Sequence, residues 1–193
     1  MDELTLNQKQ KFESIWAPEA QGHYRKGSCG QRLVPEFVRV TNAPFVVNDY
    51  GSGTGRSAVE LAKLGYTVRM FDIASNALED EAKSMLGGKL SFREANLWDL
   101  PEDIEKTPWG FCADVLMLIP PEKIDATLAG ISRTCDNCFF EVYAWSYKWR
   151  EVEYTVTQWD AQKWLEKFKE YWPDVKQLQI PGQEPRMIFV AKK

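Results

Sequence analysis

The residues best suited to bind a ligand lie in one glycine-rich turn. Gly51, Gly53 and Gly55 alternate with small residues soon after a short apolar run, Phe45–Val47, and an amphipathic helical pattern follows them. Glycine lets a ligand approach the backbone, and the amino terminus of a helix offers unpaired N–H groups with a partial positive charge. The pattern predicts a strand, a ligand-binding turn and a helix, in that order.

Two acids near this turn indicate the kind of ligand. Asp49 stands just before the glycines, and Asp72 ends a second predicted strand, about the 20 residues on at which nucleotide-binding βαβ units place a ribose-binding acid. The dinucleotide pattern G-x-G-x-x-G needs a glycine where Arg56 stands. Asp49 would repel a diphosphate and attract an amino group or a sulfonium. The turn therefore favours a cationic adenosine derivative.

Alternating strand and helix patterns predict a doubly wound, mostly parallel α/β sheet. The last two strands, Val175–Ile180 and Arg186–Ala191, are expected to form an antiparallel hairpin that closes the sheet. No repeat, linker or low-complexity segment interrupts the chain, so residues 1–193 are expected to form a single domain. The helices are predicted over residues 57–64, 74–86, 121–133 and 158–171.

Two predicted helices carry apolar faces that indicate core packing. The face of the first of them consists of Ala58, Leu61, Ala62 and Leu64, with Gly65 as the cap. The last has a broad stripe of Trp159, Trp164, Leu165, Phe168 and Trp172, which we interpret as core rather than as a substrate cage.

These motifs resemble the class I S-adenosylmethionine (SAM)-dependent methyltransferases, in which an acid-x-G-x-G-x-G turn follows the first strand and an acid ends the second. The resemblance implies a Rossmann-like fold, with SAM as cofactor and S-adenosylhomocysteine as product. Asn96 stands where this family has an acid or amide for the adenine amino group, and Leu97 would supply the next backbone N–H. The cofactor-binding residues so implied are Asp49, Gly51, Gly53, Asp72, Ile73, Asn96 and Leu97.

Within this family the chain is most similar to small methyltransferase-like proteins of bacteriophages. They share an amino-terminal Tyr-Arg, the stretch Leu-Trp-Asp-Leu-Pro at residues 97–101 and Gly-Phe-Cys-x-Asp-Val at residues 110–115. In the resembled proteins the Tyr-Arg pair lies over the cofactor, so Tyr24 and Arg25 are expected to cover SAM. Residues 1–40 would then form an amino-terminal helix and a lid, the alternative being an ordinary surface loop.

The chain departs from these relatives on the wall that faces the transferred methyl group. They commonly read Met-Glu-His-Ile-Pro where residues 116–120 read Leu-Met-Leu-Ile-Pro, and they often have histidine at the position of Thr157. No catalytic residue is therefore predicted. His23 is the only histidine and the one candidate base, although a lone histidine beside an aromatic residue is more often incidental. Methyl transfer depends mainly on orientation and desolvation, and needs a base only when the acceptor must lose a proton.

Three functions stay open on these grounds. The first is a methyltransferase acting on a small molecule or a modest biomolecule. The second is a SAM-binding protein without transfer, which acts by sequestration or as a regulatory subunit. The third is a SAM-consuming lyase or hydrolase. The net charge of −4 disfavours an extended nucleic acid as partner.

The apolar stretches and the cysteines of the chain bear on its cellular location and on metal binding. No apolar stretch approaches the ~18–20 residues of a membrane span, and the first residues lack the apolar core of a signal peptide. We therefore expect a cytoplasmic protein, in the host cytoplasm if a phage encodes it. The four cysteines are expected to be free thiols. Cys135 and Cys138 form a C-x-x-C without two further ligands nearby, so no metal site is predicted.

Overall fold

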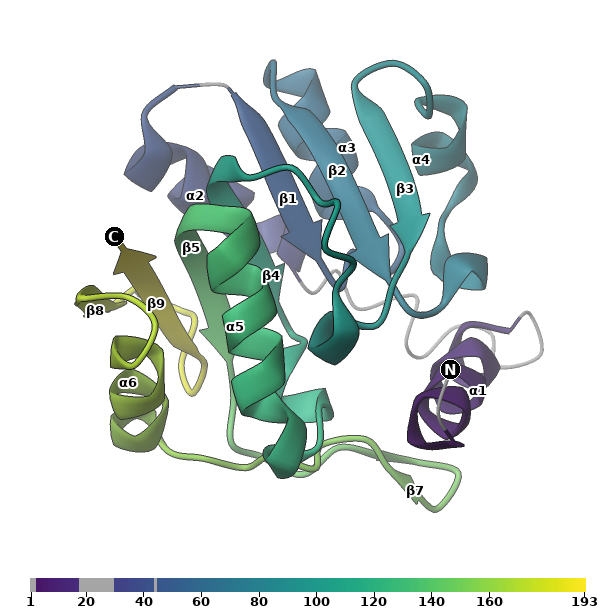
Figure 1. Ribbon diagram of the computed structural model, residues 1–193, viewed down its shortest axis with the longest axis vertical. Coiled ribbons are helices and arrows are strands. Elements are labelled where there is room, and N and C mark those ends of the chain that lie inside the picture. Colours follow the sequence, from purple (N-terminus) through teal and green to yellow (C-terminus); the bar gives the residue numbers. More distant parts are fainter. Residues whose placement is uncertain (1–2, 18–29, 44) are drawn as a thin grey trace. The chain divides into compact units, whose positions relative to one another are not determined.

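The computed structural model describes residues 3–17, 30–43 and 45–193 (Figure 1). By its internal contacts the chain divides into two compact units, Met1–Leu97 and Trp98–Lys193. Within the described part, no helix is both long enough and apolar enough to cross a membrane.

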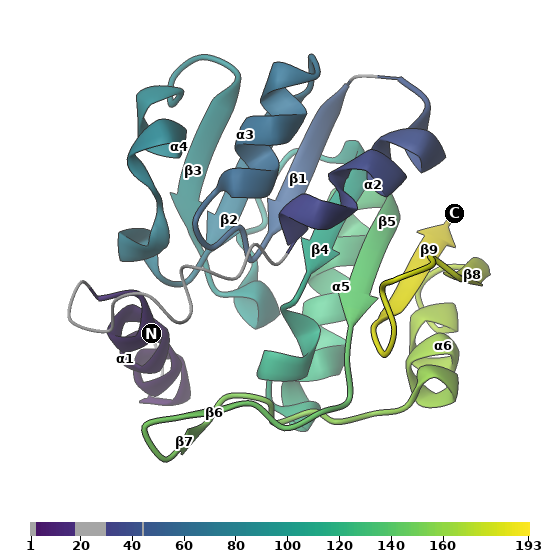
Figure 2. The ribbon, with the colours of Figure 1, turned by 180° about the vertical axis from the view of Figure 1, so that it is seen from behind.

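The first unit is built on three parallel strands, paired in the order β3-β2-β1. They are β1 (Val46–Tyr50), β2 (Thr67–Asp72) and β3 (Leu90–Glu94). The helices of this unit are α1 (Glu3–Trp16), α2 (Val34–Thr41), α3 (Arg56–Lys63) and α4 (Asp80–Ser84), with 3-10 turns η2 (Gly30–Leu33) and η3 (Ser75–Ala77). Helix α3 packs on β2 and contacts α2 and α4 (Figure 2). The glycine turn connects β1 to this helix.

Helix α3 follows the predicted pattern except at its last apolar residue. Ala58, Leu61 and Ala62 are buried as expected. Leu64 is 52% exposed, because the helix ends at Lys63 and Leu64 is its cap. Gly65 then takes a φ of 102°, which reverses the chain toward β2.

The helix predicted over residues 74–86 is wrong in extent. The structure has the short turn η3, an extended Leu78 with ψ 132°, and then the five-residue helix α4. In one continuous helix Ala77 and Ala82 would lie about 140° apart around the axis, so only one of them could face the core. Breaking the helix at Leu78 allows both to be buried.

The second unit contains four strands in the order β4-β5-β9-β8. β4 (Thr107–Ala113) and β5 (Cys135–Val142) are parallel, whereas β9 (Met187–Lys192) runs antiparallel to both β5 and β8 (Asp174–Leu178). The predicted closing hairpin is therefore confirmed. A two-stranded ribbon of β6 (Lys148–Trp149) and β7 (Val152–Glu153) lies between β5 and the last helix in the chain.

Two helices cover the strands of the second unit (Figure 1). Helix α5 (Ile124–Thr134) packs on β4 and β5, and α6 (Ala161–Lys169) packs on β8 and β9. Of the predicted aromatic stripe, Trp164, Phe168 and Trp172 are fully buried, which confirms core packing for these three. The remaining short turns are η4 (Leu97–Asp99), η5 (Leu116–Leu118) and η6 (Pro121–Lys123).

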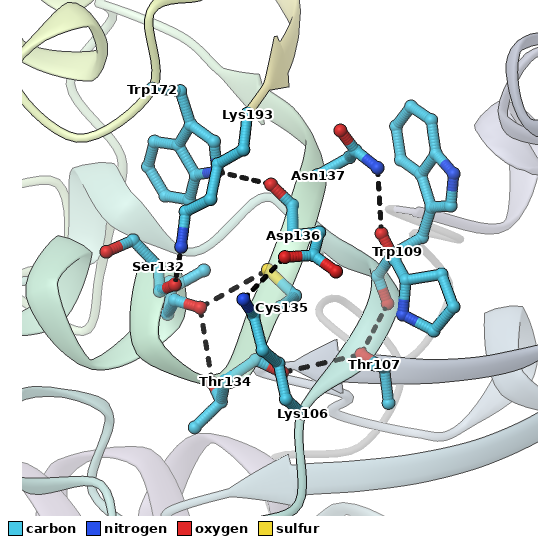
Figure 3. Close-up of polar contacts among 12 residues, drawn as sticks. Lys106, Thr107, Trp109, Ser132, Thr134, Cys135, Asp136, Asn137, Trp172 and Lys193 are labelled. Carbon is cyan, nitrogen blue, oxygen red and sulfur yellow. Dashed lines mark hydrogen bonds and ion pairs between the residues drawn. The ribbon is translucent and has the colours of Figure 1, made fainter.

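The amino-terminal ends of β4 and β5 are held by structural hydrogen bonds (Figure 3). The Thr107 hydroxyl donates to the carbonyl of Trp109 over 2.9 Å, and the indole N–H of Trp172 donates to the carbonyl of Asp136 over 3.0 Å. In open α/β sheets ligands bind at the opposite, carboxyl ends of the strands. The residues predicted to do chemistry follow those ends.

Candidate functional site

Asp49 is a buried acid near the carboxyl end of β1. The strand runs to Tyr50, so Asp49 belongs to the strand and its side chain is only 3% exposed. Its Oδ2 atom has no hydrogen-bond partner in the described part of the chain. Burial, with a smaller contribution from the charge of Asp72, raises the pKa of Asp49 to about 8. Among the described residues no cation forms an ion pair with this carboxyl group, so its ionised form is not stabilised by them.

The glycine turn after β1 brings a backbone segment close to a tryptophan. Gly53 has a φ of 50°, and a Cβ atom built on it would lie 3.4 Å from the Trp16 ring. Gly51 also has a positive φ, and its N–H donates to the carbonyl of Phe71 at the end of β2 over 2.7 Å. The turn is thus anchored to β2. Because its glycines carry no side chain, the backbone of the turn stays accessible to close contacts such as that with Trp16.

Gly55 has a packing role that the spacing alone did not reveal. It caps α3 with a φ of 79°, and a Cβ atom there would come within 2.7 Å of the Cβ atom of Ala82 in α4. This contact explains why the third glycine comes one residue earlier than in the dinucleotide pattern: it accommodates α4 rather than a ligand.

Asp72 ends β2 and fixes the turn from the other side. Its Oδ2 accepts the N–H of Gly53 and its Oδ1 accepts the N–H of Ala74, each over 2.8 Å. Burial raises the pKa of Asp72, while the N–H groups of Ala74, Gly53 and Ile73 oppose the shift. Each carboxylate oxygen retains a further lone pair, so the side chain can still accept hydroxyl groups.

The two residues predicted to contact adenine follow β3. Asn96 donates from Nδ2 to the hydroxyl oxygen of Thr5 in α1 over 2.9 Å. Leu97 begins the turn η4 and is buried. All seven predicted cofactor-binding residues that the structure describes therefore lie in the first unit, at or near the carboxyl ends of its three strands.

One face of α1 lies along this edge of the unit. Thr5 bonds Asn96, Lys9 pairs with Glu94 at the end of β3, the carbonyl of Glu13 accepts the Asn76 amide over 2.9 Å, and Trp16 approaches Gly53. Thr5, Lys9 and Glu13 were not predicted to lie near the ligand site, although residues four apart in a helix share one face. Tyr24, Arg25 and His23 lie outside the described residues, and their roles stay predictions.

The segment that replaces the Glu-His pair is apolar and tightly held. Residues 116–118 form η5 and are buried. The carbonyl of Met117 accepts the N–H groups of Val156 and Thr157, and the hydroxyl of the buried Thr157 donates to the carbonyl of Ile119 over 2.6 Å. Neither position therefore offers a group that could take a proton.

The thiols give no sign of a metal centre. Cys112, Cys135 and Cys138 are buried and form no disulfide with one another, and Cys29 lies outside the described residues. No group of three or more His, Cys, Asp or Glu side chains suited to a metal ion occurs within the described ranges.

Comparisons with known proteins bear on this geometry. Residues 47–137, which contain the turn, both acids and Asn96, match the family model described as a methyltransferase domain. In a search of solved structures, 1,6-didemethyltoxoflavin-N1-methyltransferase from Burkholderia thailandensis superposes with a TM-score of 0.78 at 15% identity, over 99% of this chain and 89% of that one. The chain has the Rossmann-like methyltransferase fold.

Two further structures share this fold. The complex of DhpI with S-adenosylhomocysteine has a TM-score of 0.73 at 15% identity, covering 98% of this chain and 96% of the other. Magnesium protoporphyrin IX methyltransferase from Synechocystis PCC 6803 has a TM-score of 0.63 at 16% identity, covering 97% and 84%. No curated protein sequence matches the chain. The domain match and these neighbours support a methyltransferase.

Proposed function

We propose that this protein is a SAM-dependent methyltransferase that acts on a small molecule. The observation that carries the proposal is the buried Oδ2 atom of Asp49 beside the glycine turn, which no described residue contacts with a hydrogen bond. A ligand that combines an ammonium group, a sulfonium and a ribose supplies the missing positive charge to Asp49 and hydroxyl donors to Asp72. Structures of this fold with bound S-adenosylhomocysteine support the same ligand.

The remaining site residues follow from this placement. In the proposal Gly51 and Gly53 let the methionine part of SAM lie against the backbone, and Ile73 and Leu97 border the adenine ring. Asn96 accepts the adenine amino group, its own amide being held by Thr5. Tyr24 and Arg25 cover the bound ligand.

The chemistry then depends on orientation. SAM would supply an electrophilic methyl group on its sulfonium. Residues 116–118, where the resembled proteins carry an acid and an imidazole, are apolar and buried in this chain, so we propose that this segment supplies no base. We therefore propose an acceptor whose nucleophile is already unprotonated or loses its proton to water.

The nature of the acceptor is proposed from two sources. The neighbours named above include enzymes for a didemethyltoxoflavin and a magnesium porphyrin, both small planar molecules. The net charge of −4 argues against an extended nucleic acid. We also propose that residues 1–193 act as one domain, that the protein works in the cytoplasm, and that its nearest kin are phage-encoded.

Calorimetry with SAM and S-adenosylhomocysteine tests the cofactor assignment. The wild type should bind both, and Asp49→Asn should bind both at least tenfold more weakly, because a charge-assisted contact is replaced by a neutral one. Asp80→Asn is the matched control, since Asp80 is a fully exposed acid of α4 in the same unit. Equal binding by wild type and Asp49→Asn would refute the assignment.

Incubation with SAM separates the three functions. Formation of S-adenosylhomocysteine only when a small-molecule acceptor is present indicates the methyltransferase. Consumption of SAM without any acceptor indicates the lyase or hydrolase. Tight binding without turnover over a broad acceptor panel indicates the binding protein.

A further inference from the structure

Helix α1 contacts the segments that follow all three strands of the first unit. The contacts along the helix come in the order of the paired strands: Thr5 with Asn96 after β3, Glu13 with Asn76 after β2, and Trp16 with Gly53 after β1. Helix α1 therefore runs along the edge at which the ligand is proposed to bind.

Gln8 lies beside this row of contacts, on a buried flank of α1. At about 100° per residue, Gln8 is about 60° around the helix from Thr5 and about 20° from Ile15. Ile15 is only 2% exposed, so this flank faces the protein interior. The exposed Gln10 is about 200° from Gln8, on the far side of the helix. A polar amide on the buried flank needs hydrogen-bond partners.

The amide oxygen of Gln8 has no such partner among the described residues. Gln8 Oε1 is buried, and no described residue donates a hydrogen bond to it. A carbonyl oxygen can only accept, and a buried acceptor without a donor is costly. The group that satisfies Gln8 Oε1 is therefore an N–H or O–H donor of a bound molecule.

Gln8 and Asn96 have Thr5 as a common neighbour. Asn96 Nδ2 donates to Thr5 Oγ1 over 2.9 Å. Thr5 and Gln8 are three residues apart in α1, which places their Cβ atoms about 5–6 Å from each other. All three residues belong to the first unit. Two amide side chains thus lie near each other after β3, where the purine of the ligand is proposed to bind.

We infer that Gln8 is a specificity-determining residue whose Oε1 accepts one N–H of the adenine amino group. The inference rests on the proposed SAM-dependent function. An amino group on a purine carries two N–H donors in one plane, so it serves Gln8 and Asn96 together. A purine without that amino group leaves the buried oxygen of Gln8 unpaired. Helix α1 thereby selects adenine among the purines.

Two ligands test this selection. One is S-adenosylhomocysteine, and the other is its 6-deamino analogue, in which a hydrogen atom replaces the amino group of the purine. The ribose and the homocysteine part are the same in both. In calorimetry with the wild type, the analogue should bind about tenfold more weakly or worse, because two hydrogen bonds are lost.

Gln8→Met removes the acceptor and keeps an unbranched side chain. The variant should bind S-adenosylhomocysteine about fivefold more weakly than wild type, because one neutral hydrogen bond is lost. It should bind the 6-deamino analogue no more weakly than wild type, because no acceptor is left unpaired. Gln10→Met is the matched control, since it makes the same change at an exposed position of the same helix. The control should leave both affinities within about twofold of wild type.

A conservative variant separates recognition from packing. Gln8→Glu keeps an acceptor oxygen at this position and should retain the preference for S-adenosylhomocysteine over the analogue. Circular dichroism checks that each variant folds. Gln8→Leu gives the same comparison if Gln8→Met does not fold.

Each outcome decides the matter. A loss of affinity in Gln8→Met that is equal for the two ligands would show that Gln8 only positions α1, and would overturn the inference. Unchanged binding of S-adenosylhomocysteine by Gln8→Met, or equal binding of the two ligands by the wild type, would also overturn it. Failure of S-adenosylhomocysteine to bind the wild type would overturn the proposed function instead.

Discussion

The backbone N–H of Gly53 donates to Asp72 Oδ2 over 2.8 Å, so that the turn after β1 is fastened to the end of β2. The other oxygen of the same carboxylate accepts the N–H of Ala74, also over 2.8 Å. Asp72 therefore shapes the turn in addition to its proposed contact with the ribose. A substitution has to separate these two tasks.

Two substitutions of Asp72 should separate its role in the turn from its proposed contact with the ribose. Asp72→Ala should weaken SAM and S-adenosylhomocysteine together by tenfold or more, since each hydrogen bond to a charged group contributes about 1.5–3 kcal/mol. Asp72→Asn keeps one acceptor oxygen for Gly53 and should retain more affinity than the alanine variant. Calorimetry measures both. Unchanged affinity in Asp72→Ala with an intact fold would exclude the ribose contact.

Asp49 should make the ligand-free protein less stable as the pH rises. Its folded pKa of about 8 exceeds the value of 3.8 expected in the unfolded chain, so between these values the folded state holds the proton more tightly. The free energy of unfolding should fall by up to about 1.4 kcal/mol per pH unit over this window. Asp49→Asn should remove this slope and be more stable than wild type at pH 8 and above, as urea denaturation at pH 5, 7 and 9 would show.

The same residue links ligand binding to protons. A bound cation should favour ionised Asp49, so binding of SAM near pH 7 should release a proton. Calorimetry in buffers of different ionisation enthalpy measures that release. Asp49→Asn should release none from this position, and an unaltered proton count in the variant would contradict the assignment.

The glycines of the turn should differ in what they affect. Gly55→Ala places a Cβ atom 2.7 Å from Ala82 and should destabilise the fold by about 1–3 kcal/mol. Gly53→Ala strains a backbone with a φ of 50° but makes only an ordinary contact of 3.4 Å with Trp16, so it should destabilise the fold less than Gly55→Ala and should lose SAM affinity. Thermal unfolding and calorimetry on the pair give the comparison. A Gly53→Ala variant with wild-type affinity would place the ligand elsewhere.

Thr5 should contribute to binding through Asn96. Thr5→Val preserves the shape of the side chain and removes the oxygen that accepts the Asn96 amide. We expect SAM affinity to fall about fivefold, since a neutral hydrogen bond contributes about 1 kcal/mol. Thr41→Val, at the end of α2, is the control. Equal losses in the two variants would show a general effect on stability.

Methyl transfer should proceed without a protein base. The rate should then follow the ionisation of the acceptor, and His23→Ala should leave kcat within a few fold of wild type. If His23 is the base, the pH–rate profile should instead show a pKa near 6.5 and the variant should lose about 100-fold or more.

Local patterns in the sequence predicted the turn, both acids and the carboxyl-terminal hairpin. Asp49, the glycines and Asp72 lie within one βαβ unit, so their spacing carries the information. The break at Leu78 was not predicted, because it depends on how Ala77 and Ala82 both reach the core. The ion pair between Asp114 and Arg186 was not predicted either, because the two residues are 72 positions apart and meet only where β9 returns antiparallel to β5.

The buried hydroxyl of Thr157 limits which side chains this position can accept. That hydroxyl donates to the carbonyl of Ile119, the backbone N–H of Thr157 donates to the carbonyl of Met117, and the residue is fully buried. A histidine at this position would have to replace those hydrogen bonds. We therefore expect Thr157→His to destabilise the protein unless residues 116–120 and 154–156 change with it.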